Sequence, residues 1–310
     1  MKTSCPVLVV ALYNREIPAR RVLDSLASAN YPDDNIRLVI SIDNDNNANK
    51  QIFDLANNFH WPFGDKEVIY HEKKLGIRDH FNFCGDITQK YGTVVFVEDD
   101  LFVSKHYYDY LQQALDFFKN EKQVAGISLF SYNHIEQWAN PLPFIPIDDG
   151  SDNYFLQQAS WGQIWTAEWW SDYKKWFDVN GKADLVNSLP QVPETIKGWP
   201  ASSWKKYYIT YMILNNKYYV FPRSSMATNF DDPGTNRKLN TVDYQSNLMV
   251  NKRNFNFCSF DTSLSIYDSY FEILPDILKK LNPELKKYEF EVNLYGMKEL
   301  SSISKELVLR

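Results

Sequence analysis

Three consecutive carboxylates, Glu98, Asp99 and Asp100, are the residues of this 310-residue chain with the clearest chemical potential. They directly follow the apolar run Thr93–Val97, and an apolar segment comes after them, so packed structure on both sides would hold them in place. Carboxylates are hard oxygen ligands that suit Mg²⁺ or Mn²⁺, which often bridge a protein and the phosphates of a substrate. The alternative is a strand-to-helix turn whose acids are favoured by the helix dipole. The triplet therefore indicates a candidate Mn²⁺ or Mg²⁺ site.

The first 120 residues alternate between short apolar runs and amphipathic stretches. Apolar runs at 7–12, 37–43, 67–71 and 93–97 are typical of buried parallel strands, and a helical pattern follows each of them. Such alternation predicts an α/β fold with a mostly parallel sheet flanked by helices. A fifth strand is predicted at 124–128.

Polar and charged side chains stand where these predicted strands end. In an open α/β sheet, ligands bind beyond the carboxyl ends of the strands, so these residues should converge on one rim. They are Tyr13, Asn14 and Arg15 after the first strand, Asp43 and Asn44 after the second, Lys73, Lys74 and Arg78 after the third, and the acidic triplet after the fourth. Neither GxGxxG nor GxxxxGK[ST] is present, so a bound phosphate would depend on a metal or on basic side chains.

The composition narrows the classes of function. The 9 Trp, 20 Tyr and 20 Phe supply flat faces that can stack on sugars and bases. A net charge of −6 argues against broad binding to nucleic acid. Three scattered cysteines without metal-type spacing indicate a reduced compartment. The N-terminal apolar run lacks a cleavage site, and no window approaches ~20 apolar residues, so we expect a cytoplasmic protein. A peripheral contact with the inner face of a membrane stays open.

The second half of the chain is rich in tryptophan and in turn-forming residues. Residues 160–177 contain five Trp in eighteen positions, a pattern more common in cores than in binding platforms. The loop 230–240 combines Asp, Pro and Gly, which is typical either of an exposed turn or of a lid that closes over a ligand. We predict a single domain over 1–310. The resemblance given next implies a nucleotide-sugar-binding half at 1–120, an acceptor-binding half at 121–240 and a C-terminal extension at 241–310.

These features together resemble the GT-A glycosyltransferases, in which a DXD element stands where this chain has its acidic triplet. The likeness is nearest to the N-acetylglucosaminyltransferase I type, where Glu-Asp-Asp also follows a run of valines. The segments PVLVVALYNREIPARRVLDSL, IRDHFNF and KGWPASSWKKYY resemble three parts of that enzyme. SWGQIW resembles a motif of bacterial relatives from polysaccharide loci.

The resemblance implies metal-dependent transfer of a hexosyl or N-acetylhexosaminyl group from a UDP-linked sugar to a glycan or lipid-linked saccharide, in bacterial surface polysaccharide synthesis. Asp100 would be the metal ligand. The donor would be bound by Tyr13, Arg15, Asp43, Arg78, His80, Glu98 and Asp99. Trp161, Trp165 and Trp204 would face the acceptor. Without the resemblance, His80 would be interpreted as a hydrogen-bonded helix histidine, Arg15 as a solvated turn residue and Asp43 as a turn-forming residue.

One departure from the family affects the chemistry. Lys205 and Lys206 stand where the family has two Asp, one of which is thought to deprotonate the acceptor hydroxyl. An inverting transfer needs such a base, so another carboxylate must serve. The candidates are Asp232 and Asp149, followed by Asp152 and Asp231 in the same acidic loops. A sugar-nucleotidyl transferase is an alternative, although the usual glycine-rich opening is missing. A non-catalytic glycan-binding protein is another.

Overall fold

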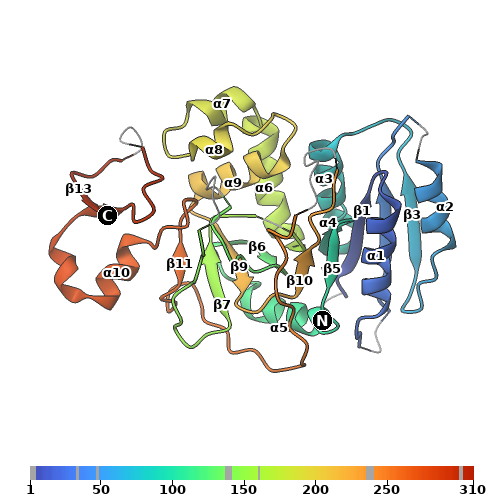
Figure 1. The fold of residues 1–310 in the computed structure, drawn as a ribbon, viewed down its shortest axis with the longest axis horizontal. Coiled ribbons are helices and arrows are strands. Elements are labelled where there is room, and N and C mark those ends of the chain that lie inside the picture. Colours follow the sequence, from blue (N-terminus) through green and yellow to red (C-terminus); the bar gives the residue numbers. More distant parts are fainter. Residues whose placement is uncertain are drawn as a thin grey trace.

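The computed structural model describes residues 5–32, 35–46, 49–136, 142–159, 161–234, 241–299 and 303–310. Within them, a nine-stranded sheet flanked by helices dominates the fold (Figure 1). This confirms the predicted α/β class. The strands of this sheet are β1 (Val7–Leu12), β2 (Leu38–Ile42), β3 (Lys66–Tyr70), β4 (Thr93–Glu98), β6 (Val124–Ser128), β7 (Asn153–Leu156), β8 (Gln163–Thr166), β9 (Tyr218–Pro222) and β11 (Ile266–Tyr267).

The strand order across the sheet is β11-β7-β9-β6-β8-β4-β1-β2-β3. β1, β2, β3 and β4 pair in parallel. β8 is antiparallel to both of its neighbours, so β6 on its far side runs in the same direction as β4. β9 is parallel to β6, whereas β7 is antiparallel to β9. The carboxyl ends of β1 to β4, β6 and β9 therefore meet at one edge of the sheet.

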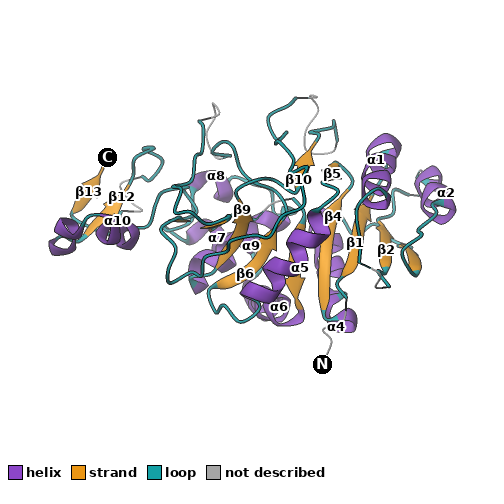
Figure 2. Cartoon of the chain, turned by 90° about the horizontal axis from the view of Figure 1, so that it is seen from below, coloured by secondary structure: helices purple, strands orange, loops and turns teal. Residues whose placement is uncertain are grey.

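The helices cover the sheet and carry its connections (Figure 2). They are α1 (Glu16–Ala27), α2 (Lys50–Asn58), α3 (Ile77–Asp86), α4 (Thr88–Tyr91), α5 (Tyr107–Phe118), α6 (Ala167–Asn180), α7 (Ala183–Ser188), α8 (Glu194–Lys197), α9 (Trp204–Asn215) and α10 (Pro275–Leu281), followed by a 3₁₀ turn at Pro283–Lys287. The four strands predicted in the first third and the strand at 124–128 all appear. The sequence did not predict β8, which lies inside the Trp-rich segment.

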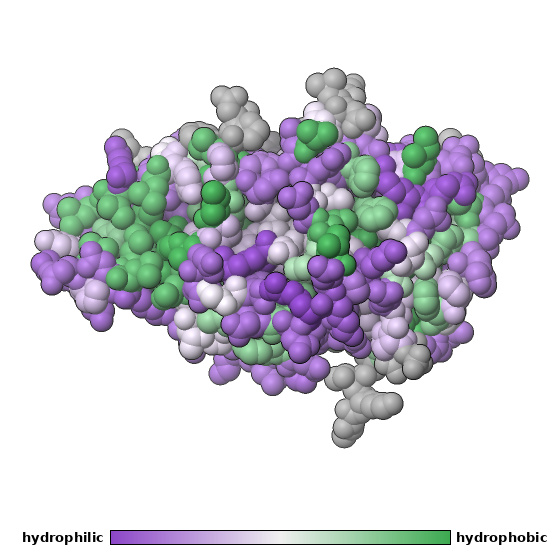
Figure 3. All heavy atoms as spheres, turned by 60° about the horizontal axis from the view of Figure 1, so that its bottom comes forward, coloured by the Kyte–Doolittle hydropathy of each residue, from purple (hydrophilic) through white to green (hydrophobic). Residues whose placement is uncertain are grey.

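Two small sheets complete the described chain. β5 (Leu101–Val103) pairs with β10 (Ala227–Asn229), which brings the segment after β10 beside the acidic triplet. β12 (Phe290–Val292) pairs with β13 (Leu307–Leu309) in the C-terminal part. Apolar side chains gather on that part of the surface, at the left of Figure 3. They include the exposed Leu281, Tyr288, Leu294, Leu307 and Leu309. Among the described residues, no helix has the length and apolar character needed to cross a membrane.

Close packing between α3 and α6 yields a first prediction. Gly85 of α3 lies against the Trp170 ring, and a Cβ at that position would overlap ring atoms. The ring is held by a hydrogen bond from Trp170 Nε1 to Asp86 Oδ1 of 2.7 Å. Gly85→Ala is therefore expected to lower the free energy of unfolding by about 1–3 kcal/mol, measured by urea denaturation.

Gly198→Ala is the matched control, because the nearest atoms to an added Cβ there are 3.5 Å away. Unchanged stability of the Gly85 variant would show that the ring moves aside without cost.

Candidate active site

Arg15 and the acidic triplet meet at the carboxyl edge of the sheet. Arg15 follows β1 and Asp99 follows β4, and these two strands are direct neighbours. Arg15 Nε donates to Asp99 Oδ2 at 3.1 Å, and Arg15 Nη2 donates to Asp99 Oδ1 and, at 3.3 Å, to Asp100 Oδ2. These carboxylates raise the pKa of Arg15, although burial opposes the rise. Of the basic residues predicted on this rim, Arg15 is thus the one that the described contacts join to the triplet.

Burial raises the pKa of two carboxyl groups of the triplet. It raises the pKa of Glu98 to about 8, and the neighbouring Asp100 and Asp99 add to the rise, while Lys205 and Arg15 oppose it. Burial also raises the pKa of Asp99 to about 6, against the lowering effect of Arg15. The protonated forms of Glu98 and Asp99 are thereby favoured, and a bound cation would favour the charged forms instead.

The triplet offers oxygen atoms to a cation. Glu98 Oε2 and Asp100 Oδ1 are buried and have no hydrogen-bond partner. Carboxylate oxygens of this kind are the ligands that hard cations prefer. Within the described residues, however, no group of three or more His, Cys, Asp or Glu side chains is arranged to hold a metal ion. One or two carboxylates completed by substrate phosphates are a common Mg²⁺ arrangement, and these residues fit it.

Asp43 and His80 are both inside the protein. Asp43 Oδ1 accepts from Leu75 N at 2.7 Å, and Asp43 Oδ2 accepts from Gly76 N at 2.9 Å, so the carboxylate holds the loop before α3. His80 Nε2 lies 2.8 Å from Ser41 Oγ, and burial lowers the pKa of His80 to about 4. His80 is therefore buried and hydrogen-bonded, as expected for a helix histidine with a structural role. Asp43 shapes the rim through backbone contacts that the sequence did not predict.

Tyr13 and Arg78 make different contacts at this edge of the sheet. The Tyr13 hydroxyl donates to Asp45 Oδ1 and accepts from Lys74 Nζ, in an exposed network. Arg78, at the start of α3, donates through Nη1 to Ala201 O at 3.2 Å. Arg78 also lines a hollow with Leu75, Gly76, Ile77, Asp79, Ala201 and Ser202. Arg78 thus connects the start of α3 to the segment before α9.

Asp232 lies near the triplet, but its carboxylate is engaged. It pairs with Arg21 of α1, and its backbone carbonyl accepts from Arg15 Nη1 at 3.0 Å. Phe230 N donates to Asp100 O at 2.9 Å, which anchors the segment against the triplet. Asp232 therefore has a cation partner of its own, and its role as the base stays a prediction. Residues 235–240 of the loop expected to form a turn or a lid lie outside the described residues.

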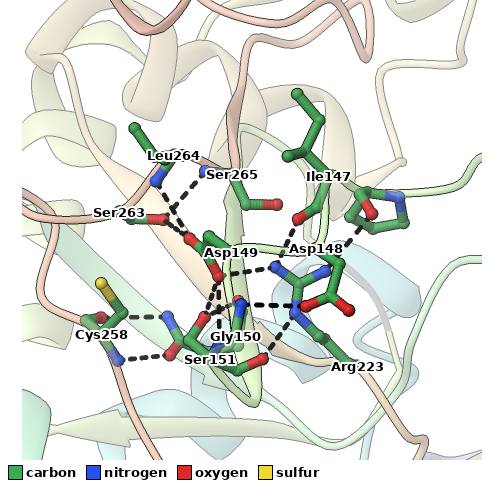
Figure 4. Close-up of polar contacts among 12 residues, drawn as sticks. Ile147, Asp148, Asp149, Gly150, Ser151, Arg223, Cys258, Ser263, Leu264 and Ser265 are labelled. Carbon is green, nitrogen blue, oxygen red and sulfur yellow. Dashed lines mark hydrogen bonds and ion pairs between the residues drawn. The ribbon is translucent and has the colours of Figure 1, made fainter. Parts of the chain in front are cut away.

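Asp149 is far more constrained, as Figure 4 shows. Asp149 Oδ1 accepts from Arg223 Nη2 at 3.0 Å and from the backbone and side chain of Ser151. Asp149 Oδ2 accepts from Ser263 Oγ and Leu264 N, both at 3.0 Å. These hydrogen bonds lower its pKa although burial opposes them. Five donors exceed the roughly four lone-pair sites of a carboxylate, which argues against Asp149 as a base, although that expectation stays a prediction. Asp152 is likewise paired, with Arg253.

Two of the three predicted acceptor tryptophans are core residues. Trp165 is fully buried and Trp204 is 4% exposed, and Trp204 stacks on Phe81 with ring centroids 4.1 Å apart. Their side chains therefore pack the interior, because a strand (β8) and a helix start (α9) turn them inward. Trp161 is half-buried and stays a candidate. Trp199, which the sequence prediction omitted, has the same partial exposure.

The two lysines that depart from the family have different roles. Lys206 is buried, and its Nζ donates to Lys197 O at 2.6 Å and Trp199 O at 3.0 Å. Lys205 faces the site: its Nζ donates to both oxygens of Glu136, at 2.6 and 2.8 Å. Glu136 was not predicted, because it stands in a loop after β6 without any motif around it.

Comparisons with known proteins identify no family by sequence. No family model matches the chain. No curated protein matches it either. Solved structures give partial matches, among them TarS 1–349 from S. aureus, with a TM-score of 0.43 and 15% identity over 72% of this chain and 59% of that one. The same TarS fragment in complex with UDP-GlcNAc gives a TM-score of 0.41 and 15% identity over 71% and 59%.

A mannosyltransferase from Pyrobaculum calidifontis, in complex with GDP-Man and Mn²⁺, gives a TM-score of 0.34 and 15% identity, over 42% of this chain and 36% of that one. The chain thus spans less than two thirds of the TarS fragment. TM-scores below 0.5 describe only a partial overlap between the two folds.

Proposed function

We propose that this protein is a GT-A-type glycosyltransferase that binds a nucleotide-diphospho sugar at the carboxyl edge of its sheet and transfers the sugar to a glycan. The observation that carries the proposal is the cluster of Arg15 and the acidic triplet at the ends of β1 and β4. Ligands of open α/β sheets bind at such an edge, and the buried, unpartnered oxygens of Glu98 and Asp100 suit a cation.

The residues of the chain suggest a division of tasks. Asp100 and Glu98 would hold Mn²⁺ or Mg²⁺, which neutralises the diphosphate leaving group when it is bound. Arg15 is placed to contact the same diphosphate, since its guanidinium already lies against Asp99 and Asp100. Tyr13 and Lys74 lie beside the end of β1, on the side of β2, and are positioned to face the nucleoside.

The donor is proposed to be UDP-linked, carrying a hexosyl or N-acetylhexosaminyl group. The acceptor is proposed to be the growing end of a bacterial surface glycan, and the protein would then act on the cytoplasmic side of the membrane. These assignments follow from the resemblance to the GT-A glycosyltransferases, including the N-acetylglucosaminyltransferase I type. Trp161 and Trp199, both half-buried, are proposed to face this acceptor.

Nucleotide binding tests the proposal without knowledge of the acceptor. UDP should bind more tightly in Mn²⁺ than in EDTA, because the carboxylates need phosphates to complete the metal's coordination. Asp100→Asn should remove this enhancement, which corresponds to about 1.5–3 kcal/mol, or roughly ten- to a hundred-fold in affinity. Isothermal titration calorimetry of UDP in both buffers measures it.

Asp116→Asn, at an exposed carboxylate of α5, serves as the control and should bind UDP like the wild type. Equal affinity for UDP in EDTA and in Mn²⁺ would contradict the metal assignment, and absence of UDP binding would contradict the proposed function.

A further inference from the structure

Glu136 lies at the same edge of the sheet as the acidic triplet, although 36 residues separate it from Asp100 in the sequence. It follows β6, which runs parallel to β4 across the intervening β8. Lys205, the first residue after Trp204 in α9, reaches Glu136 through its ammonium group. The segment just before Lys205 contacts the same edge, since Ala201 O accepts from Arg78 Nη1 at 3.2 Å. The Glu136 carboxylate therefore lies on the rim that carries the proposed donor site.

The surroundings of this carboxylate suit a saccharide. Lys205 Nζ lies 5.0 Å from the ring centroid of Trp161 and 5.4 Å from that of Trp199. Both rings are half-buried, so each retains some surface for contact with a ligand. A sugar presents apolar C–H faces and hydroxyl groups, which match aromatic faces beside a carboxylate. The Lys205 neighbourhood therefore combines stacking surfaces with a hydrogen-bond acceptor.

Glu136 is held in place but not saturated. Glu136 Oε2 accepts from the Tyr132 hydroxyl at 2.9 Å as well as from Lys205, whereas Glu136 Oε1 accepts from Lys205. Its side chain is 11% exposed. A carboxylate has roughly four lone-pair sites, so capacity remains for an acceptor hydroxyl. Asp149 has no such capacity. Asp232, like Glu136, pairs with one cation, so what distinguishes Glu136 is its place beside the Trp161 and Trp199 rings.

We propose that Glu136 is the base that accepts the proton of the acceptor hydroxyl during sugar transfer, with Lys205 and Tyr132 as positioning residues. This inference rests on the proposed glycosyltransferase function and deepens it. It also gives a reason for Lys205: the lysine orients a carboxylate from another element in a position where the family has an acid of its own.

The step balances in atoms and charge. The acceptor oxygen forms a bond to the anomeric carbon of the donor, and the bond from that carbon to the diphosphate oxygen breaks. The electron pair of the broken bond stays on the diphosphate. The hydroxyl proton moves to the Glu136 carboxylate and is then lost to solvent. No oxidant or further reactant is needed.

Water can replace the unknown acceptor in the test, since a base at this position also deprotonates water. Release of UDP from UDP-glucose and UDP-GlcNAc in Mn²⁺ would be followed for the wild type and Glu136→Gln. We expect release to fall about 100-fold in the variant, the lower range for loss of a general base. UDP affinity should stay unchanged, so the loss appears in kcat rather than KM. Glu194→Gln, an exposed glutamate of α8, is the control.

Two further variants keep the test decisive if Glu136→Gln does not fold. Glu136→Asp retains the charge but withdraws it from the acceptor, and should slow release about ten-fold or more while UDP still binds. Lys205→Gln should also slow release, and Lys205→Arg should restore most of it, which a purely structural role would not predict.

Equal UDP release by the wild type and the Glu136 variants, with UDP bound by all of them, overturns the inference and leaves the proposed function standing. If the wild type does not bind UDP, the proposed function fails first, and this inference fails with it.

Discussion

Asp149→Ala is expected to lower the free energy of unfolding by about 3–5 kcal/mol, the range for breaking a buried ion pair from one side. Asp149 has a side chain only 3% exposed and joins three segments of chain through Arg223, Ser151 and the backbone of Leu264. Its removal leaves the Arg223 guanidinium largely buried without a counter-charge. Urea denaturation followed by circular dichroism measures the loss.

The neighbouring Asp148→Ala is the matched control. Asp148 is exposed and accepts one hydrogen bond, from Gly150 N at 2.9 Å, so its loss should cost less than about 1 kcal/mol. UDP binding by any folded Asp149 variant should equal that of the wild type, because Asp149 is expected to act on stability alone. If Asp149→Ala costs no more than Asp148→Ala, the remaining contacts of Arg223 suffice to hold these segments together.

Glu98→Gln is expected to stabilise the protein at pH 8 by several kcal/mol relative to the wild type, and to have little effect near pH 4.5. Burial raises the pKa of Glu98 from 4.5 to about 8, so the folded protein binds a proton there that the unfolded chain has lost. Stability therefore falls as pH rises from about 4.5 to about 8. At about 1.36 kcal/mol per pKa unit, the difference reaches roughly 2–4 kcal/mol once partial exposure is allowed for.

Urea denaturation at a series of pH values gives the difference between the variant and the wild type directly. The exposed Glu284, in the 3₁₀ turn, provides the control variant Glu284→Gln, which should follow the wild type at every pH. A Glu98→Gln variant that is no more stable than the wild type at pH 8 would show that Glu98 is ionised without penalty. The same variant should bind UDP with Mn²⁺ less tightly, since it loses one of the proposed cation ligands.

The sequence predicted the first half of the fold well because its signals are local. Continuous apolar runs such as Val7–Leu12 are buried on both faces of a parallel sheet, and each is followed by a helical pattern. β8 was not predicted, because Gln163–Thr166 is only four residues long and lies among tryptophans that suggest no period. Its position depends on pairing with β4 and β6, which are distant in the chain.

The difference between local signals and contacts between distant segments also explains which parts of the candidate site were predicted. Arg15 and the triplet were placed on one rim because strand ends are predictable, and the structure brings them into contact. The sequence did not settle the inward direction of Trp165 and Trp204, because tryptophans are more common in cores but also suit a binding platform. Glu136 carries no sequence signal, and only its pairing with Lys205 distinguishes it from other loop glutamates.

The position of β8 has a consequence for how the chain folds during synthesis. β1 to β4 are complete once residue 98 has been made, and they pair with one another. This part of the sheet can therefore assemble as soon as it emerges. The outer edge of β4 must then wait for β8, whose last residue is Thr166. At roughly 5–20 residues per second this takes roughly 3–14 s. During that time the unpaired edge of an apolar strand is open to other chains, so newly made copies are expected to aggregate there unless a chaperone covers it.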